Sequence, residues 1–123
     1  MKYKETRTET VTFTATGELK TFFTAAGDCI VRLVDPIGNP NLKFYINNVN
    51  CGGFANGSFT ENISAKTLSK KVEFMGGNNR LNNSTMDYFD LTLCLKKGDE
   101  LQIYCGYYAP SYGNPQVTVY VYD

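Results

Sequence analysis

Apolar and polar side chains alternate along most of this chain, and turn-forming residues interrupt the alternation at intervals of about eight to twelve residues. The closing segment 117–122, VTVYVY, is the clearest example, with valine at every second position. Successive side chains of a β-strand point to opposite faces, so this period is typical of strands with one buried and one solvated face. The pattern predicts an all-β protein, an antiparallel β-sandwich of about eight or nine short strands.

The expected strands cover 5–15, 19–25, 29–34, 42–49, 58–64, 68–75, 87–95, 101–108 and 117–122. Pro36 and Pro40 indicate a loop, because proline lacks the backbone N–H that a central strand needs. The stretch 76–85, GGNNRLNNST, is polar and aperiodic and is expected to be an exposed loop. Leu68 and Val72 are four residues apart, which leaves a short amphipathic helix open as an alternative there.

The chain has 123 residues and a mass of 13.8 kDa, which is the size of one domain. Hydrophobic residues make up 42% and charged residues 20%, as in folded globular proteins. No linker or tandem repeat divides the sequence, so we expect a single β-sandwich domain over 1–123. One terminal strand is expected at a sheet edge, where Lys2, Lys4, Glu5 and Arg7 would discourage uncontrolled pairing.

The opening MKYKETRTETVTF lacks the apolar run of about 7–15 residues that a secretory signal requires. No later apolar run approaches the roughly 20 residues that span a bilayer. We therefore expect synthesis in the cytoplasm without a signal peptide, and no membrane insertion.

Charge and composition argue against several functional classes. Twelve basic and twelve acidic residues cancel, whereas nucleic-acid binders usually carry a basic excess. Histidine is absent, so the commonest general base and zinc ligand are missing. Asp87 and Asp90 are three residues apart and would point to opposite faces of a strand, unlike a glycosidase pair. We expect no enzyme, no catalytic residues, no metal and no cofactor, and an enzyme with an unusual site stays an open alternative.

The four cysteines, Cys29, Cys51, Cys94 and Cys105, could form two disulfides in three pairings. Three of them lie in strand-like runs, where a thiol behaves as a small apolar side chain. We therefore favour free thiols, and disulfides remain the alternative. No C-x-x-C pair is present to begin a zinc site.

Tyrosine is the unusual residue of this chain: there are nine, and six of them fall in the last 20 residues. Tyrosine combines apolar area with a hydroxyl and is enriched at interfaces. The alternative is that some of these rings pack against the core. The predicted binding surface consists of Tyr107, Tyr108, Tyr112, Tyr120, Tyr122 and Asn114.

The segment LTLCLKKGDELQIYC, Leu91 to Cys105, resembles the late hairpin of jelly rolls in the complement-type globular head and tumour-necrosis-factor-like superfamily. The closing QVTVYVYD resembles their short final strand. FTATGELKTFFTAAGDCIVRLV resembles the sheet-start pattern of small jelly rolls in bacteriophage appendages. The resemblance implies a jelly-roll-like, surface-exposed binding or structural module without catalysis.

These observations lead to the hypothesis of a virion structural or appendage protein, such as a bacteriophage capsid decoration protein or a head- or tail-fibre module. It would bind other virion or surface proteins, form a homo-oligomer and be assembled on a virion surface. The alternative is a carbohydrate-binding module, in which tyrosines stack on sugar rings and asparagines bind hydroxyls.

Overall fold

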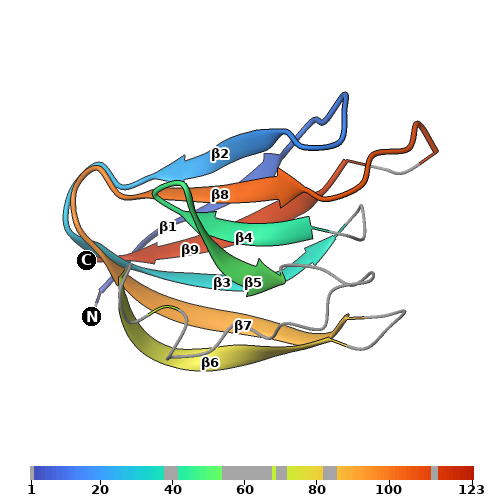
Figure 1. The fold of residues 1–123 in the computed structure, drawn as a ribbon. Coiled ribbons are helices and arrows are strands. Elements are labelled where there is room, and N and C mark those ends of the chain that lie inside the picture. Colours follow the sequence, from blue (N-terminus) through green and yellow to red (C-terminus); the bar gives the residue numbers. More distant parts are fainter. Residues whose placement is uncertain (1, 38–41, 54–67, 69–71, 82–85, 112–113) are drawn as a thin grey trace.

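The structure is a computed structural model that describes residues 2–37, 42–53, 68, 72–81, 86–111 and 114–123. The described residues form nine strands (Figure 1). They are β1 (Tyr3–Thr10), β2 (Leu19–Thr24), β3 (Cys29–Ile37), β4 (Leu42–Ile46), β5 (Val49–Gly53), β6 (Glu73–Leu81), β7 (Met86–Leu95), β8 (Glu100–Cys105) and β9 (Gln116–Tyr122).

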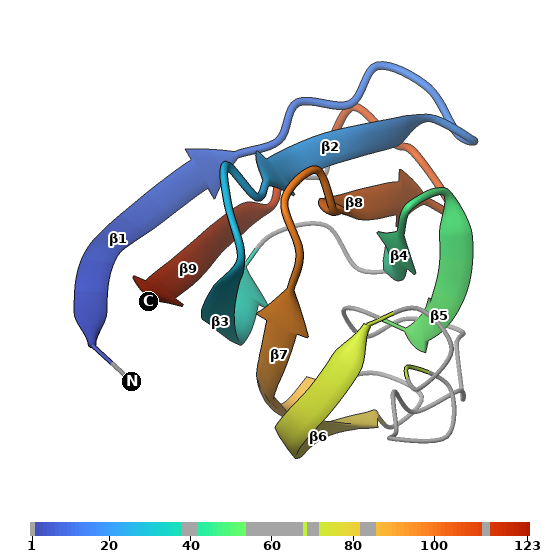
Figure 2. The same ribbon diagram turned by 90° about the vertical axis from the view of Figure 1, so that its left-hand side faces the viewer.

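The strands lie in two antiparallel sheets that face each other (Figure 2). One sheet has the order β1-β9-β3-β7-β6 and the other the order β2-β8-β4-β5. Every described strand pair is antiparallel. The prediction of an all-β antiparallel sandwich is confirmed, and a terminal strand, β1, lies at a sheet edge.

The core is built from the apolar half of each alternating strand. Its main members are Val31, Leu33, Leu42, Phe44, Ile46, Leu91, Leu93, Leu95, Leu101, Ile103, Val117, Val119 and Val121. Burying one such side chain stabilises the fold by about 1.5–3 kcal/mol. β2 departs from the alternation, because Phe22 and Phe23 are both buried. The register between β2 and β8 shifts at this point, and such an irregularity lets adjacent residues face the same side.

The expectation that Leu91–Cys105 forms a hairpin is wrong. β7 pairs with β3 and β6, whereas β8 pairs with β2 and β4, so the KKGDE turn carries the chain from one sheet to the other. Within this turn the backbone N–H of Lys96 donates to Asp99 Oδ2 at 2.8 Å. Gly98 has a φ of 92°, a conformation that side chains disfavour. A linear pattern of strand, turn and strand does not tell whether the two strands share a sheet.

The expectation of a loop over 76–85 is also wrong for most of that range. β6 extends through GGNNRL and pairs with β7 from Glu73, opposite Cys94, to Leu81, opposite Met86. β6 is an edge strand with a single described neighbour. Backbone pairing with that neighbour does not demand an apolar–polar alternation, so the sequence pattern missed it. Residues 82–85 lie outside the described residues.

Other boundaries moved by several residues. β1 ends at Thr10, although Val11 and Phe13 beyond it are buried. β3 continues through Pro36, where its pairing with β9 shifts register, and its pairing with β7 has ended at Val34. β5 (Val49–Gly53) lies mostly in the stretch between the expected strands 42–49 and 58–64.

The segment around residue 68 departs from the expected strand. The Val72 N–H donates to the Leu68 carbonyl at 3.1 Å, as in one helical turn, and β6 begins only at Glu73. The rest of the helical alternative and the expected strand 58–64 lie outside the described residues.

Candidate functional site

The outward sides of β1, β9 and β3 form a continuous surface that we call the tyrosine face. Antiparallel register arranges it in three rows, each crossing the three strands. The rows are Tyr3–Tyr122–Ile30, Thr6–Tyr120–Arg32 and Thr8–Thr118–Val34. The alternate residues of β9 and β3 point into the core, so sheet formation alone brings these side chains together.

Contacts within the tyrosine face hold its rings in place. The Tyr3 and Tyr122 rings meet edge to face, with centroids 5.9 Å apart and an interplanar angle of 72°. The hydroxyls of Tyr3 and Thr6 are 2.8 Å apart, and those of Thr8 and Thr118 are 3.4 Å apart. Tyr3 is 56% exposed, while the two tyrosines of β9 are half-buried. The face therefore presents aromatic area in fixed orientations.

Arg32 adds a compensated charge to this face. Its Nε donates to Asp90 Oδ1 at 2.9 Å, and its Nη2 donates to Asp90 Oδ2 at 2.7 Å. This two-pronged pairing raises the pKa of the Arg32 guanidinium above its ordinary value, mainly through the side-chain hydrogen bond and then through the charge of Asp90. Asp90 belongs to β7, on the side of β3 away from β9, so this pairing holds the planar group toward β7 and leaves no net local charge.

The predicted binding residues come from two parts of the structure. Tyr120 and Tyr122 lie on the tyrosine face, whereas Tyr107, Tyr108 and Asn114 belong to the connection between β8 and β9. That connection meets β9 at Gln116, and β9 spans about 20 Å at roughly 3.3 Å per residue. Tyr107 is 53% exposed, and Tyr108 packs against the core. Tyr112 lies outside the described residues.

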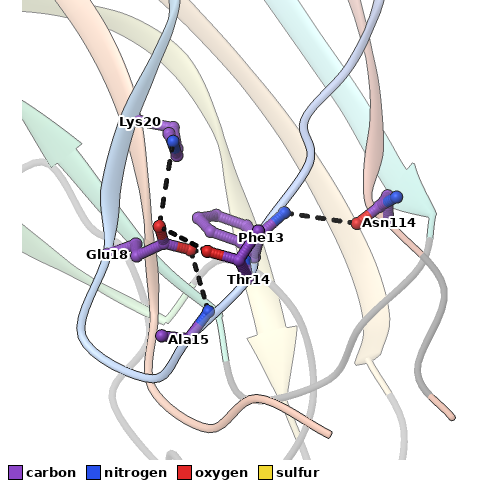
Figure 3. A network of polar contacts seen from close by, with 6 residues as sticks. All are labelled: Phe13, Thr14, Ala15, Glu18, Lys20 and Asn114. Carbon is purple, nitrogen blue, oxygen red and sulfur yellow. Dashed lines mark hydrogen bonds and ion pairs between the residues drawn. The ribbon is translucent and has the colours of Figure 1, made fainter. Parts of the chain in front are cut away.

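Asn114 has a structural contact that the sequence did not indicate. Its Oδ1 accepts a hydrogen bond from the Phe13 N–H at 3.3 Å (Figure 3). The backbones of Val11 and Pro115 are joined by a further hydrogen bond of 2.8 Å, and the Tyr108 N–H donates to Thr16 Oγ1 at 2.8 Å. The β8–β9 connection is thus tied to the segment between β1 and β2.

Glu18 organises the same segment (Figure 3). Its carboxylate accepts hydrogen bonds from the backbone N–H groups of Thr14 and Ala15 and from the Thr14 hydroxyl, and Lys20 Nζ lies 3.9 Å away. These donors, the two backbone groups first, hold the pKa of Glu18 below its ordinary value. The carboxylate therefore stabilises this turn.

Four tyrosines fell outside the predicted binding surface, and the structure gives ring contacts for three of them, Tyr3, Tyr45 and Tyr104. Tyr3 joins the tyrosine face because β1 pairs with β9 across the whole length of the chain. Tyr45 and Tyr104 stack on the outer side of the other sheet, with centroids 5.5 Å apart and planes at 22°. Only the long-range register of β4 and β8 brings this second pair together.

An open groove of about 440 Å³ runs between β1 and β2. Its walls carry threonines and charged side chains, among them Arg7, Glu9 and Lys20. The Arg7 guanidinium lies 5.5 Å from the centre of the Phe23 ring. The groove is polar and exposes the underside of β1.

All four cysteines are thiols in the structure. Cys51 and Cys105 are buried, and Cys29 and Cys94 are half-buried. Burial is the first cause that raises the pKa of Cys29, Cys94 and Cys105. Among the described residues, no three Cys, Asp or Glu side chains gather as a metal site would require.

Comparisons with protein families, with curated proteins and with solved structures gave no match. No helix in the described part of the chain is long and apolar enough to cross a membrane. The functional argument therefore depends on the surfaces described above.

Proposed function

We propose that this protein is a non-catalytic structural module of a virion, a capsid decoration protein or a head- or tail-fibre module. It binds neighbouring protein subunits through the tyrosine face. The observation that carries the proposal is the ordered grid of three tyrosines, two aliphatic side chains and one paired arginine on a single sheet face. Tyrosine and arginine are among the residue types enriched at protein interfaces.

The strand pairing supports a jelly-roll architecture for this module. β1 pairs with β9, β2 with β8, β3 with β7 and β4 with β5, so the pairs are nested along the chain. Nested pairing of this kind is what a long hairpin rolled into two sheets produces, and β6 is one strand added beside β7. Jelly rolls are common in capsid proteins and lectins, so this support is by fold analogy.

The energetics of the tyrosine face suit a weak contact repeated many times. A tyrosine has few rotatable bonds, and Tyr3 and Tyr122 already hold each other, so little side-chain entropy remains to be lost on binding. Asp90 already compensates Arg32, so burying the pair leaves no uncompensated charge. In a symmetric assembly such contacts gain strength through effective concentration.

The proposal is tested on virus particles prepared from cells that make this protein. The wild-type chain should band with the particles in a density gradient and be present in stoichiometric amounts by mass spectrometry. The variant Tyr120→Thr/Tyr122→Thr keeps strand-forming residues but removes both rings, and it should be lost from the particles. The control Tyr45→Thr changes the stacked pair on the other sheet and should band as the wild type does.

Absence of the wild-type chain from particles would overturn the virion assignment. Retention of the double variant would overturn the assignment of the tyrosine face. A glycan array with the purified chain covers the carbohydrate alternative, for which the exposed ring of Tyr107 is the best candidate. Glycan binding that disappears in Tyr107→Ala would replace the proposal with that alternative.

A further inference from the structure

β1 is an edge strand that is open on its outer side. It is eight residues long and pairs only with β9 in the described part of the chain. Figure 2 shows it at the margin of its sheet, where its C-terminal end comes close to β2 and its N-terminal part curves away from β2. Seven of its eight residues are exposed, and its underside faces the polar groove rather than the core. An edge of this length is a template for another strand.

The underside of β1 carries alternating charges. Glu5, Arg7 and Glu9 lie opposite Val121, Val119 and Val117, the inward residues of β9. The Arg7 and Glu5 side chains are 4.0 Å apart. Within the described residues, the Glu9 carboxylate has no ion-pair partner. Charges on an edge usually prevent pairing, but an alternating series becomes complementary to itself in the right register.

A second copy of β1 can pair antiparallel about a two-fold axis, and residues equidistant from the axis then face each other. With the axis at Thr8, Arg7 of each copy lies directly opposite Glu9 of the other. Thr6 lies opposite Thr10, and Thr8 lies opposite itself. Cross-strand pairs of opposite charge and of threonines both stabilise a sheet. This register satisfies the Glu9 carboxylate of both copies by symmetry.

Two alternative registers, with the axis at Arg7 or at Thr6, are poorer. An axis at Arg7 would set the two Arg7 side chains against each other and Glu5 against Glu9, which is repulsive. An axis at Thr6 would pair Arg7 with Glu5, but it would extend the pairing through Tyr3–Glu5, where β1 is irregular against β9. The regular stretch Thr6–Thr10 therefore favours the axis at Thr8.

We infer that two copies of this chain associate through β1, antiparallel and centred on Thr8, and join their five-stranded sheets into one continuous sheet. The contact is isologous, so it closes as a dimer and does not propagate. It joins two tyrosine faces into one larger surface, a consequence that rests on the proposed function. The joined surface would engage neighbours with two sites at once.

The first experiment reverses charges and measures mass against protein concentration by sedimentation, up to about 1 mM. Glu9→Arg places arginine opposite Arg7, and Arg7→Glu places glutamate opposite Glu9, each twice. Either variant alone should dissociate with a constant about tenfold or more higher than that of the wild type. An equimolar mixture should regain the association, because positions 7 and 9 are then both positive in one copy and both negative in the other.

The second experiment tests the register by mild oxidation of single-cysteine additions. Directly opposed Cα atoms in an antiparallel pair are about 4.5–5.5 Å apart, within the range of about 4.4–6.8 Å for disulfides. Thr8→Cys should therefore form a disulfide-linked dimer. Thr6→Cys, on the same side of the same strand, faces Thr10 and should not, and the wild type controls for the native thiols.

A wild-type chain that stays monomeric over the whole range would overturn the inference. Repulsion that persists in the mixture, or a dimer linked by Thr6→Cys instead of Thr8→Cys, would overturn the register. Circular dichroism of each variant confirms that it is folded. The variant Tyr120→Thr/Tyr122→Thr should still form the dimer, so loss of particle binding in it and loss of dimerisation in Glu9→Arg separate the two proposals.

Discussion

Replacing Gln102 by methionine should destabilise the fold more than most substitutions on the outer side of a sheet do. Gln102 lies between Leu101 and Ile103, whose side chains are in the core, yet it is only 4% exposed. Its Oε1 accepts from the Asn48 N–H at 2.7 Å, and its Nε2 donates to Asn48 Oδ1 at 2.9 Å and to Thr21 Oγ1 at 3.2 Å. One side chain thus ties β8 to the β4–β5 turn and to β2.

The magnitude follows from these contacts. Each lost hydrogen bond costs about 0.5–1.5 kcal/mol, and a group left unsatisfied costs about 1–3 kcal/mol. Asn48 is exposed, so water can partly replace the hydrogen bond that its N–H loses. Methionine matches glutamine in length, so packing changes little. We expect the free energy of unfolding to fall by about 2–3 kcal/mol, a large share of the roughly 5–15 kcal/mol of a typical domain.

Urea unfolding followed by circular dichroism measures this change, and the slope of the transition should stay the same while its midpoint falls. Thr21→Val removes only one of the three partners and should cost about 1 kcal/mol. Asn48 has a φ of 67° and is left unchanged, because substitutions there would add backbone strain. A loss below about 0.5 kcal/mol in Gln102→Met would refute the argument that this network supports the turn.

Three further predictions concern the Glu18 carboxylate, the four thiols and the turn glycine Gly98. The pKa of Glu18 is lowered in the folded protein, so its carboxylate stabilises the fold at any pH above the ordinary carboxyl pKa. This stabilisation is lost as the pH falls through the pKa of the folded state. Glu18→Gln should therefore lower Tm at neutral pH and match the wild type in acid. Equal deficits at both pH values would contradict this account. Four thiols should titrate in the denatured, unreduced protein, and in the folded protein Cys94 should react before the buried Cys105; a count below four would show a disulfide. Gly98→Ala should cost about 1–2 kcal/mol in urea unfolding because φ is positive, whereas the control Gly27→Ala, which meets nothing within 4 Å, should stay within about 0.5 kcal/mol.

The candidate site could be predicted only in part. The alternation of 117–122 placed Tyr120 and Tyr122 opposite the valines, and the structure sets them on the outer side of β9. The tyrosines of the preceding connection were grouped with them only because they are near in sequence. Asn114 was predicted at the binding surface, and the structure adds a contact that sequence could not indicate, because the Phe13 N–H that donates to its Oδ1 is 101 residues away in the chain.

Local pattern determined the class of the fold, because the period of two along a strand is a property of neighbouring residues and needs no knowledge of the other strands. It also determined which side chains of the central strands are buried. Tertiary structure decided which strands share a sheet. It sent β7 and β8 into opposite layers, made a strand of the polar β6 and left the edge of β1 open. Those outcomes depend on backbone pairing between distant segments. Because the backbone groups are nearly the same in every residue, the side-chain pattern does not indicate which segments pair.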